Sequence, residues 1–111
     1  MTKYVLENQR HRIDASIEAR EKDGLWVCKI TLSTHGTRQS TTGAKGFLHL
    51  PVAINDALQF LDERAASLPD PERQVITLWL RQTNRQAWSG ISDEQRDLMY
   101  QEEHKFRLGR K

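Results

Sequence analysis

Alternation of apolar and polar residues is strongest in the first third of the chain. From residue 12 to residue 20 every second position is apolar, which is the period of a strand with one buried side. Asp23 and Gly24 then provide a tight turn, and residues 25–32 alternate again. The pattern therefore predicts a β-hairpin, and the inner side of its return strand is predicted to be the one that carries Trp26.

The hairpin is followed by a polar stretch, residues 33–46, that is rich in glycine and hydroxyl side chains and contains no acid. Within it, residues 38–42 are predicted to form a third antiparallel strand. Ahead of the hairpin, residues 4–6 suit a short edge strand before the pattern breaks.

The rest of the chain has the spacing of helices. Apolar residues recur every three or four positions over residues 51–66, where a proline occupies the first turn. A second helix is predicted to begin with Asp70 as its cap and Pro71 at its first position, although residues 74–81 also fit a strand. A capping box that starts at Ser92 predicts a last helix.

Together these elements predict an α+β protein, with a small antiparallel three-stranded sheet, one packed helix and a C-terminal helical segment. The 111 residues suit a single domain, in which residues 1–68 form the core of sheet and helix and residues 69–111 a helical extension. Apolar residues make up 37% and charged residues 29%, as in folded soluble proteins. Because the chain shows no membrane-length apolar run and no signal-peptide core, we expect a cytoplasmic protein.

Residues with reactive side chains form no recognised catalytic or metal-binding pattern. A single cysteine, Cys28, cannot form an internal disulfide and is predicted to pack in the core. The four histidines do not lie at ligand spacing, so we predict no metal, no cofactor and no catalytic residue. One enzyme hypothesis stays open: a small ribonuclease-like hydrolase in which His35 and His49 act as acid and base while Arg38 and Lys45 hold a phosphate.

Charge is unevenly distributed along the chain, although the net charge is only +2. Residues 24–55 and 104–111 contain no acid and hold seven of the 17 basic residues, which leaves 10 basic against 15 acidic residues elsewhere. Such segregation indicates a polyanionic or acidic partner. We therefore predict a non-catalytic binding module that contacts nucleic acid or an acidic protein through residues 33–46. The predicted contact residues are Lys29, His35, Arg38 and Lys45.

An alternative hypothesis assigns the function to the helical half of the chain. In that case the protein is a protein-interaction partner, such as an antitoxin-like or phage-encoded regulator, and it docks a partner or forms a homodimer. Trp79 and Trp88 are then predicted to be exposed anchors.

One family resemblance covers residues 23–63. The order Asp-Gly-Leu-Trp-Val at residues 23–27, a polar loop with Gly43, and Leu-Pro-Val-Ala-Ile at the start of residues 50–61 resembles the small bacterial β-β-β-α proteins of the HicB antitoxin type. The resemblance implies a partial RNase-H-like or double-stranded-RNA-binding-like layout, a toxin partner and a separate DNA-binding tail. The family's Pro-Asp-Leu-Pro-Gly-Cys segment is absent at residues 32–36, so no residue role is carried over.

Overall fold

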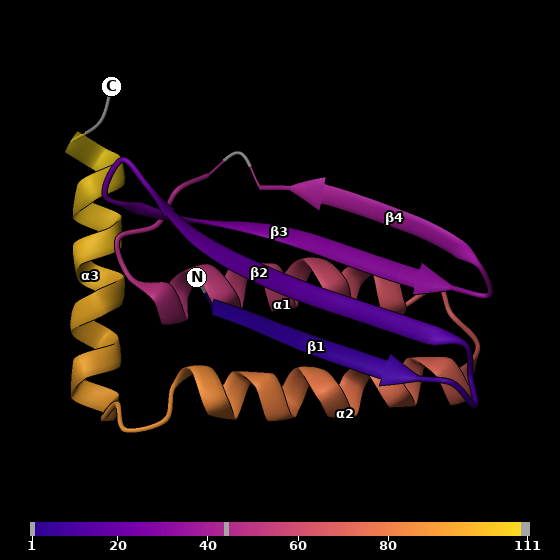
Figure 1. The fold of residues 1–111 in the computed structure, drawn as a ribbon. Coiled ribbons are helices and arrows are strands. Elements are labelled where there is room, and N and C mark those ends of the chain that lie inside the picture. The colour runs from indigo at the N-terminus through magenta and orange to yellow at the C-terminus, as the bar shows by residue number, and fades with distance from the viewer. Residues whose placement is uncertain (1, 44, 110–111) are drawn as a thin grey trace.

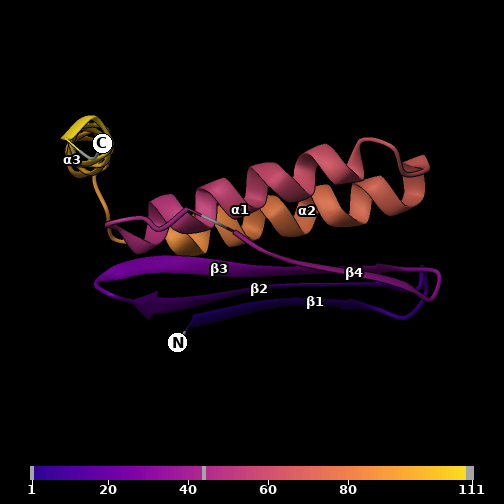
Figure 2. The ribbon, with the colours of Figure 1, turned by 90° about the horizontal axis from the view of Figure 1, so that it is seen from above.

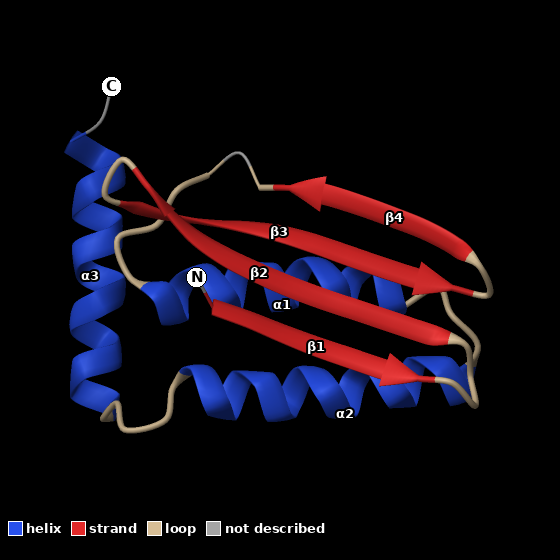
Figure 3. Ribbon diagram, in the orientation of Figure 1, coloured by secondary structure: helices blue, strands red, loops and turns tan. Residues whose placement is uncertain are grey.

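The computed structural model describes residues 2–43 and 45–109. Four antiparallel strands form one sheet in which each strand pairs with the next along the chain, and three helices follow (Figures 1 and 3). Helices α1 and α2 lie side by side on one face of this sheet, and no element of the described residues covers the other face (Figure 2). The bounds are β1 Thr2–Asn8, β2 Ile13–Lys22, β3 Leu25–Thr34, β4 Thr37–Thr42, α1 Leu50–Ala65, α2 Asp70–Ala87 and α3 Asp93–Gly109.

The predicted hairpin is confirmed as β2 and β3. Asp23 and Gly24 both have positive φ values, 55° and 80°, as a type I′ turn requires. The alternating apolar residues of β2 face the helices and are buried, which explains the period of two. They are Ile13, Ala15, Ile17 and Ala19.

The sheet has four strands where three were predicted. The short strand expected at residues 4–6 is a full edge strand, β1, which pairs with β2 from Thr2 opposite Ala19 to Asn8 opposite Ile13. Its exposed residues Lys3, Val5 and Glu7 alternate with Tyr4 and Leu6, which pack against the core, so the short apolar run concealed a longer strand.

Most of residues 33–46 is a strand and its turn. The predicted third strand is confirmed as β4, which pairs with β3. At the turn Thr34 lies opposite Thr37, and at the other end of the pairing Lys29 lies opposite Thr42. The turn between them contains His35 and Gly36, both with positive φ.

Residues 74–81 are helical, and this settles the choice that the sequence left open. Ile76 is completely buried, and Trp79 and Leu80 are each 7% exposed in the same core as the sheet. Residues 70–87 therefore belong to the core and not to an extension, because two helices are needed to cover β1, β2 and β3. The predicted Asp70 cap is wrong: Pro69 occupies the cap position, and the Asp70 carboxylate pairs with Arg73.

Helix α3 crosses the end of the molecule (Figure 1). Its predicted capping box is confirmed, because the Gln95 amide donates to Ser92 Oγ at 3.1 Å and the Ser92 amide donates to Gln95 Oε1 at 3.0 Å. The buried Glu103 accepts a hydrogen bond from the Leu48 amide and so ties α3 to the segment before α1. None of the helices in residues 2–43 and 45–109 has the length and apolar character to cross a bilayer.

Candidate functional site

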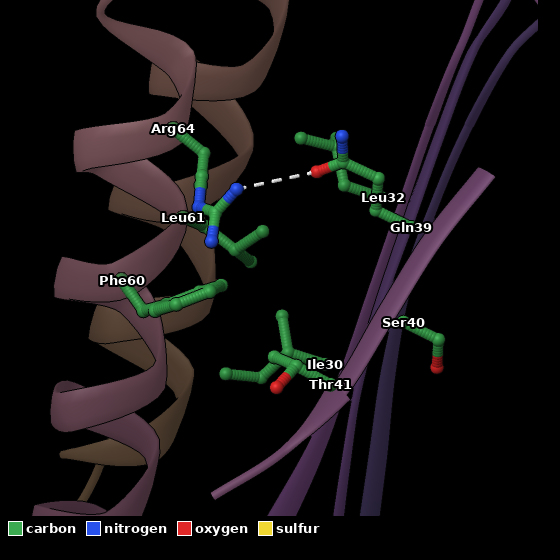
Figure 4. A pocket seen from close by; sticks show the side chains of 8 residues that line it. All are labelled: Ile30, Leu32, Gln39, Ser40, Thr41, Phe60, Leu61 and Arg64. Carbon is green, nitrogen blue, oxygen red and sulfur yellow. Dashed lines mark hydrogen bonds between the residues drawn. The ribbon is translucent and has the colours of Figure 1, made fainter. Parts of the chain in front are cut away.

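The candidate site is a groove between β4 and α1. Helix α1 packs on β2 and β3, and β4 extends beyond this cover, so that all six of its residues are exposed. A hollow of about 250 Å³ opens between the strand and the helix (Figure 4). Its lining residues are Ile30, Leu32, Gln39, Ser40, Thr41, Phe60, Leu61 and Arg64.

The groove combines an apolar floor with a polar rim. Ile30 and Leu61 form part of the floor, and the half-buried Phe60 points from α1 toward the sheet (Figure 4). The Arg64 guanidinium lies 4.8 Å from the centre of the Phe60 ring and donates a 3.4 Å hydrogen bond to Gln39 Oε1. Because this exposed bond is long, a ligand that offers Arg64 a better acceptor can replace it at small cost.

A second hollow of about 150 Å³ continues the groove along β4. The two hollows share Leu32, Gln39 and Arg64, and the second reaches Leu68 beyond the end of α1. Each is smaller than the pockets that enclose drug-sized molecules, which are about 300–1,000 Å³. An elongated groove of this kind suits an extended polypeptide better than a compact small molecule.

The free edge of β4 carries unpaired backbone groups. The Gly43 amide donates to the Cys28 carbonyl at 2.9 Å, and this bond fixes which residues face β3. Since the direction of the backbone groups alternates along an antiparallel strand, Arg38, Ser40 and Thr42 direct their N–H and C=O groups away from β3. The described residues give these groups no backbone partner. The strand also has no proline and only one charge, so it lacks the usual protection of a sheet edge.

The predicted cationic residues do not form an acid-free patch in space. Arg38 and Lys29 share the open outer face of the sheet, but Lys29 lies opposite Glu18, and Asp14 stands in the same cross-strand row as Arg38. A hydrogen bond of 2.7 Å from Arg20 is the main cause that lowers the pKa of Glu18. Charge that is segregated along the sequence is therefore mixed on this face, because neighbouring strands interleave it.

The remaining basic residues lie elsewhere. Lys45 follows the end of β4 and is exposed. Arg107, a residue of α3, donates a 3.1 Å hydrogen bond to the Gly46 carbonyl. Arg110 and Lys111 of the basic tail lie outside the described residues.

The two histidines of the ribonuclease hypothesis are at opposite ends of β3. His35 follows the strand, with its Nε2 3.4 Å from Glu72 Oε1, whereas His49 stands near the start of the strand, 3.6 Å from Glu102 Oε2. The ten residues of β3 span about 30 Å. The two imidazoles therefore cannot act on one phosphate group, and the structure does not assemble this acid–base pair.

The prediction of exposed tryptophan anchors is wrong for Trp79, which is 7% exposed in the core. It faces inward because α2 uses this side to cover the sheet. Trp88 is half-buried: it stacks on Tyr100 with the ring centres 5.8 Å apart, and Arg96 lies 5.6 Å from its ring. Both rings serve packing within the chain.

The prediction that Cys28 packs in the core is confirmed. Its side chain is 6% exposed, and its Sγ donates a 3.6 Å hydrogen bond to the Ala53 carbonyl. Burial, with a smaller contribution from the charge of Asp56, raises the pKa of the thiol to about 11. The thiol is therefore protonated and unreactive at neutral pH. The described residues contain no group of three histidine, cysteine or acidic side chains suited to a metal ion.

Sequence reasoning missed the residues that build the groove, chiefly Phe60, Arg64 and Gln39. One signal was present: Phe60 is an aromatic residue beside, and not on, the apolar face of its helix. Such a position indicates a second apolar contact for the helix.

No model of a protein family, no curated protein and no solved structure matches this chain.

Proposed function

We propose that this protein is a non-catalytic interaction module that binds an extended strand of a protein along β4. The observation that carries the proposal is a free strand edge with an apolar groove beside it. Known peptide-binding domains use the same combination, in which backbone pairing gives affinity and pockets for alternate side chains give specificity.

The geometry defines what the bound strand should look like. Its backbone pairs with Arg38, Ser40 and Thr42, and alternate side chains then point either into the groove or over the outer face of the sheet. The apolar floor at Ile30 and Leu61 favours apolar residues on the inner side. On the outer side Arg38 favours an acidic or polar residue.

Nucleic acid is a less suitable partner than a protein strand for the edge of β4. Three carboxylates, those of Glu7, Asp14 and Glu18, share the outer face with its basic residues. The ring of Trp26 lies on the inner side of the sheet with the core, and so it offers no platform on which a base can stack. Unpaired amides and carbonyls on a strand edge instead match another strand.

A phage library of random seven-residue peptides tests the proposal. We expect the selected peptides to alternate apolar and polar residues, and we expect Ser40→Pro to abolish their binding. Proline at residue 40 removes a free N–H from the edge without removing a bond to β3. Ser40→Ala is the matched control and should bind as the unaltered protein does.

Phe60→Ala separates the groove from the edge. This change removes one wall of the groove, leaves the β4 backbone intact, and should weaken selected peptides by about tenfold, which corresponds to about 1.4 kcal/mol. Peptides that bind Ser40→Pro and Phe60→Ala as tightly as the unaltered protein would overturn the proposal.

A further inference from the structure

We infer that the strand bound along β4 is β4 of a second copy, in a two-fold dimer whose continuous sheet has eight strands. The inference rests on the proposed function, since it names the occupant of the same free edge. It follows from the pairing that the strand permits with itself.

One register uses every free group of β4. Two antiparallel copies centred on Ser40 place Ser40 opposite Ser40 and Arg38 opposite Thr42 of the other copy. These are the residues whose backbone groups point outward, and each such pair in an antiparallel sheet exchanges two hydrogen bonds. The three pairs therefore form six hydrogen bonds. A register centred on Gln39 leaves Thr42 without a strand partner and forms fewer.

The side chains of β4 are compatible in this register. Its one charged residue, Arg38, lies opposite a threonine, so no like charges meet across the new strand pair. On the inner side Gln39 lies opposite Thr41 of the second copy. On the outer side, the existing pairing of β3 and β4 already brings two hydroxyls together, with Thr31 Oγ1 3.3 Å from Ser40 Oγ.

The grooves of the two copies lie on the same face of the joined sheet, because a two-fold axis perpendicular to the sheet leaves each face on its own side. The inner side chains of β4 are polar and do not match the apolar floor, but the groove of each copy opens toward the other across the two-fold axis. Figure 4 shows Arg64 reaching Gln39 along the side of the groove, with the Phe60 ring between the heights of Gln39 and Thr41. A strand edge that pairs with a second copy of itself in this way has the self-complementarity that a two-fold interface requires.

The described chain leaves room for this arrangement. Helix α2 lies on the β1 side of the molecule and α3 crosses one end of it, so neither stands beside the free edge of β4 (Figures 1 and 2). A two-fold axis through Ser40 sends the two α3 helices to opposite ends of the dimer.

Molar mass in solution tests the inference, by sedimentation velocity over a range of concentrations. The unaltered protein and Ser40→Ala should form dimers, and Ser40→Pro should raise the dimer dissociation constant by at least about tenfold. The circular dichroism spectrum of Ser40→Pro should be unchanged, which shows that the loss of dimer is not a loss of fold.

Disulfide formation tests the register. Ser40→Cys should cross-link two copies on mild oxidation, since residue 40 lies opposite itself across the axis. Val5→Cys, on the exposed outer side of β1, is the control and should not cross-link. The native Cys28 does not interfere, because it is buried.

The outcomes separate the inference from the proposed function. A monomeric protein whose Ser40→Cys variant fails to cross-link, but which still binds library peptides through β4, overturns the second copy and supports a different protein as the partner. If Ser40→Pro still forms a dimer, that dimer uses another interface, and the inference is overturned. If the unaltered protein neither dimerises nor binds library peptides, the inference and the proposed function are overturned together.

Discussion

The two edges of the sheet differ in their cover. At β1, helix α2 packs beneath the strand, and the inner residues Tyr4 and Leu6 are half-buried. The exposed positions carry two charged residues, Lys3 and Glu7, on either side of Val5. At β4 no residue is buried and only Arg38 is charged. Charged side chains and a covering helix are the means by which proteins protect a sheet edge from further pairing. The contrast teaches that β4 is the edge left available.

The largest expected effect comes from removing the cover of β1. Trp79→Ala empties a core position in α2 and should lower the free energy of unfolding by about 3–5 kcal/mol. Urea denaturation measures this change. Leu78→Ala on the exposed side of the same helix is the matched control, and its effect should stay within about 0.5 kcal/mol. Equal effects at both positions would contradict the role of α2 as cover.

A smaller effect distinguishes the two sides of β4 itself. Thr41→Pro removes a hydrogen bond to β3 and should cost about 1–3 kcal/mol, whereas Ser40→Pro removes only a free N–H and should cost much less. Thermal unfolding of the two variants under dissociating conditions gives the comparison. If Ser40→Pro were the more damaging change, the assignment of the free edge would be wrong.

The next effect depends on pH and concerns the covered part of β3. The folded protein holds the Cys28 proton more tightly than the unfolded chain does, because burial raises the pKa of the thiol from 9.0 to about 11. Its contribution to the free energy of unfolding is therefore complete below pH 9 and declines as the pH rises toward 11. When the free energy of unfolding is measured for the unaltered protein and for Cys28→Ala over this pH range, the difference between the two values should narrow as the pH rises.

A reactivity assay extends the same comparison to the groove. Leu32→Cys places a thiol on the half-buried groove side of β3, and it should react faster with a thiol reagent than Cys28 does. Similar reaction rates would contradict the difference in cover.

The sequence predicted those elements in which local pattern and tertiary packing agree. The hairpin at Asp23 and Gly24, helix α1 and the capping box at Ser92 each have a local signal that the structure confirms. Residues 74–81 were ambiguous because their β-branched and aromatic side chains suit a strand, and only packing against α1 and the sheet decides for the helix.

The candidate site was only partly predictable. The region was recognised, since residues 33–46 contain β4, but the property that matters there is a free edge and not an acid-free loop. The charges within one segment of the sequence do not determine the charge of the folded surface. Lys29, for example, has Glu18 as its neighbour only because β2 pairs with β3. The groove depends on how far α1 extends over the sheet, which no local pattern records.

The attachment of α3 has a consequence for the end of the chain. The carboxylate of Glu103 holds the Leu48 amide, and Arg107 of the same helix holds the Gly46 carbonyl, so α3 fastens the segment that connects β4 to α1. Tension applied to the C-terminus would reach this connection directly. A mechanical load on the last helix would thus be transmitted to the start of α1 and the exit from β4, and also to the start of β3 through the two backbone hydrogen bonds between Phe47 and Trp26.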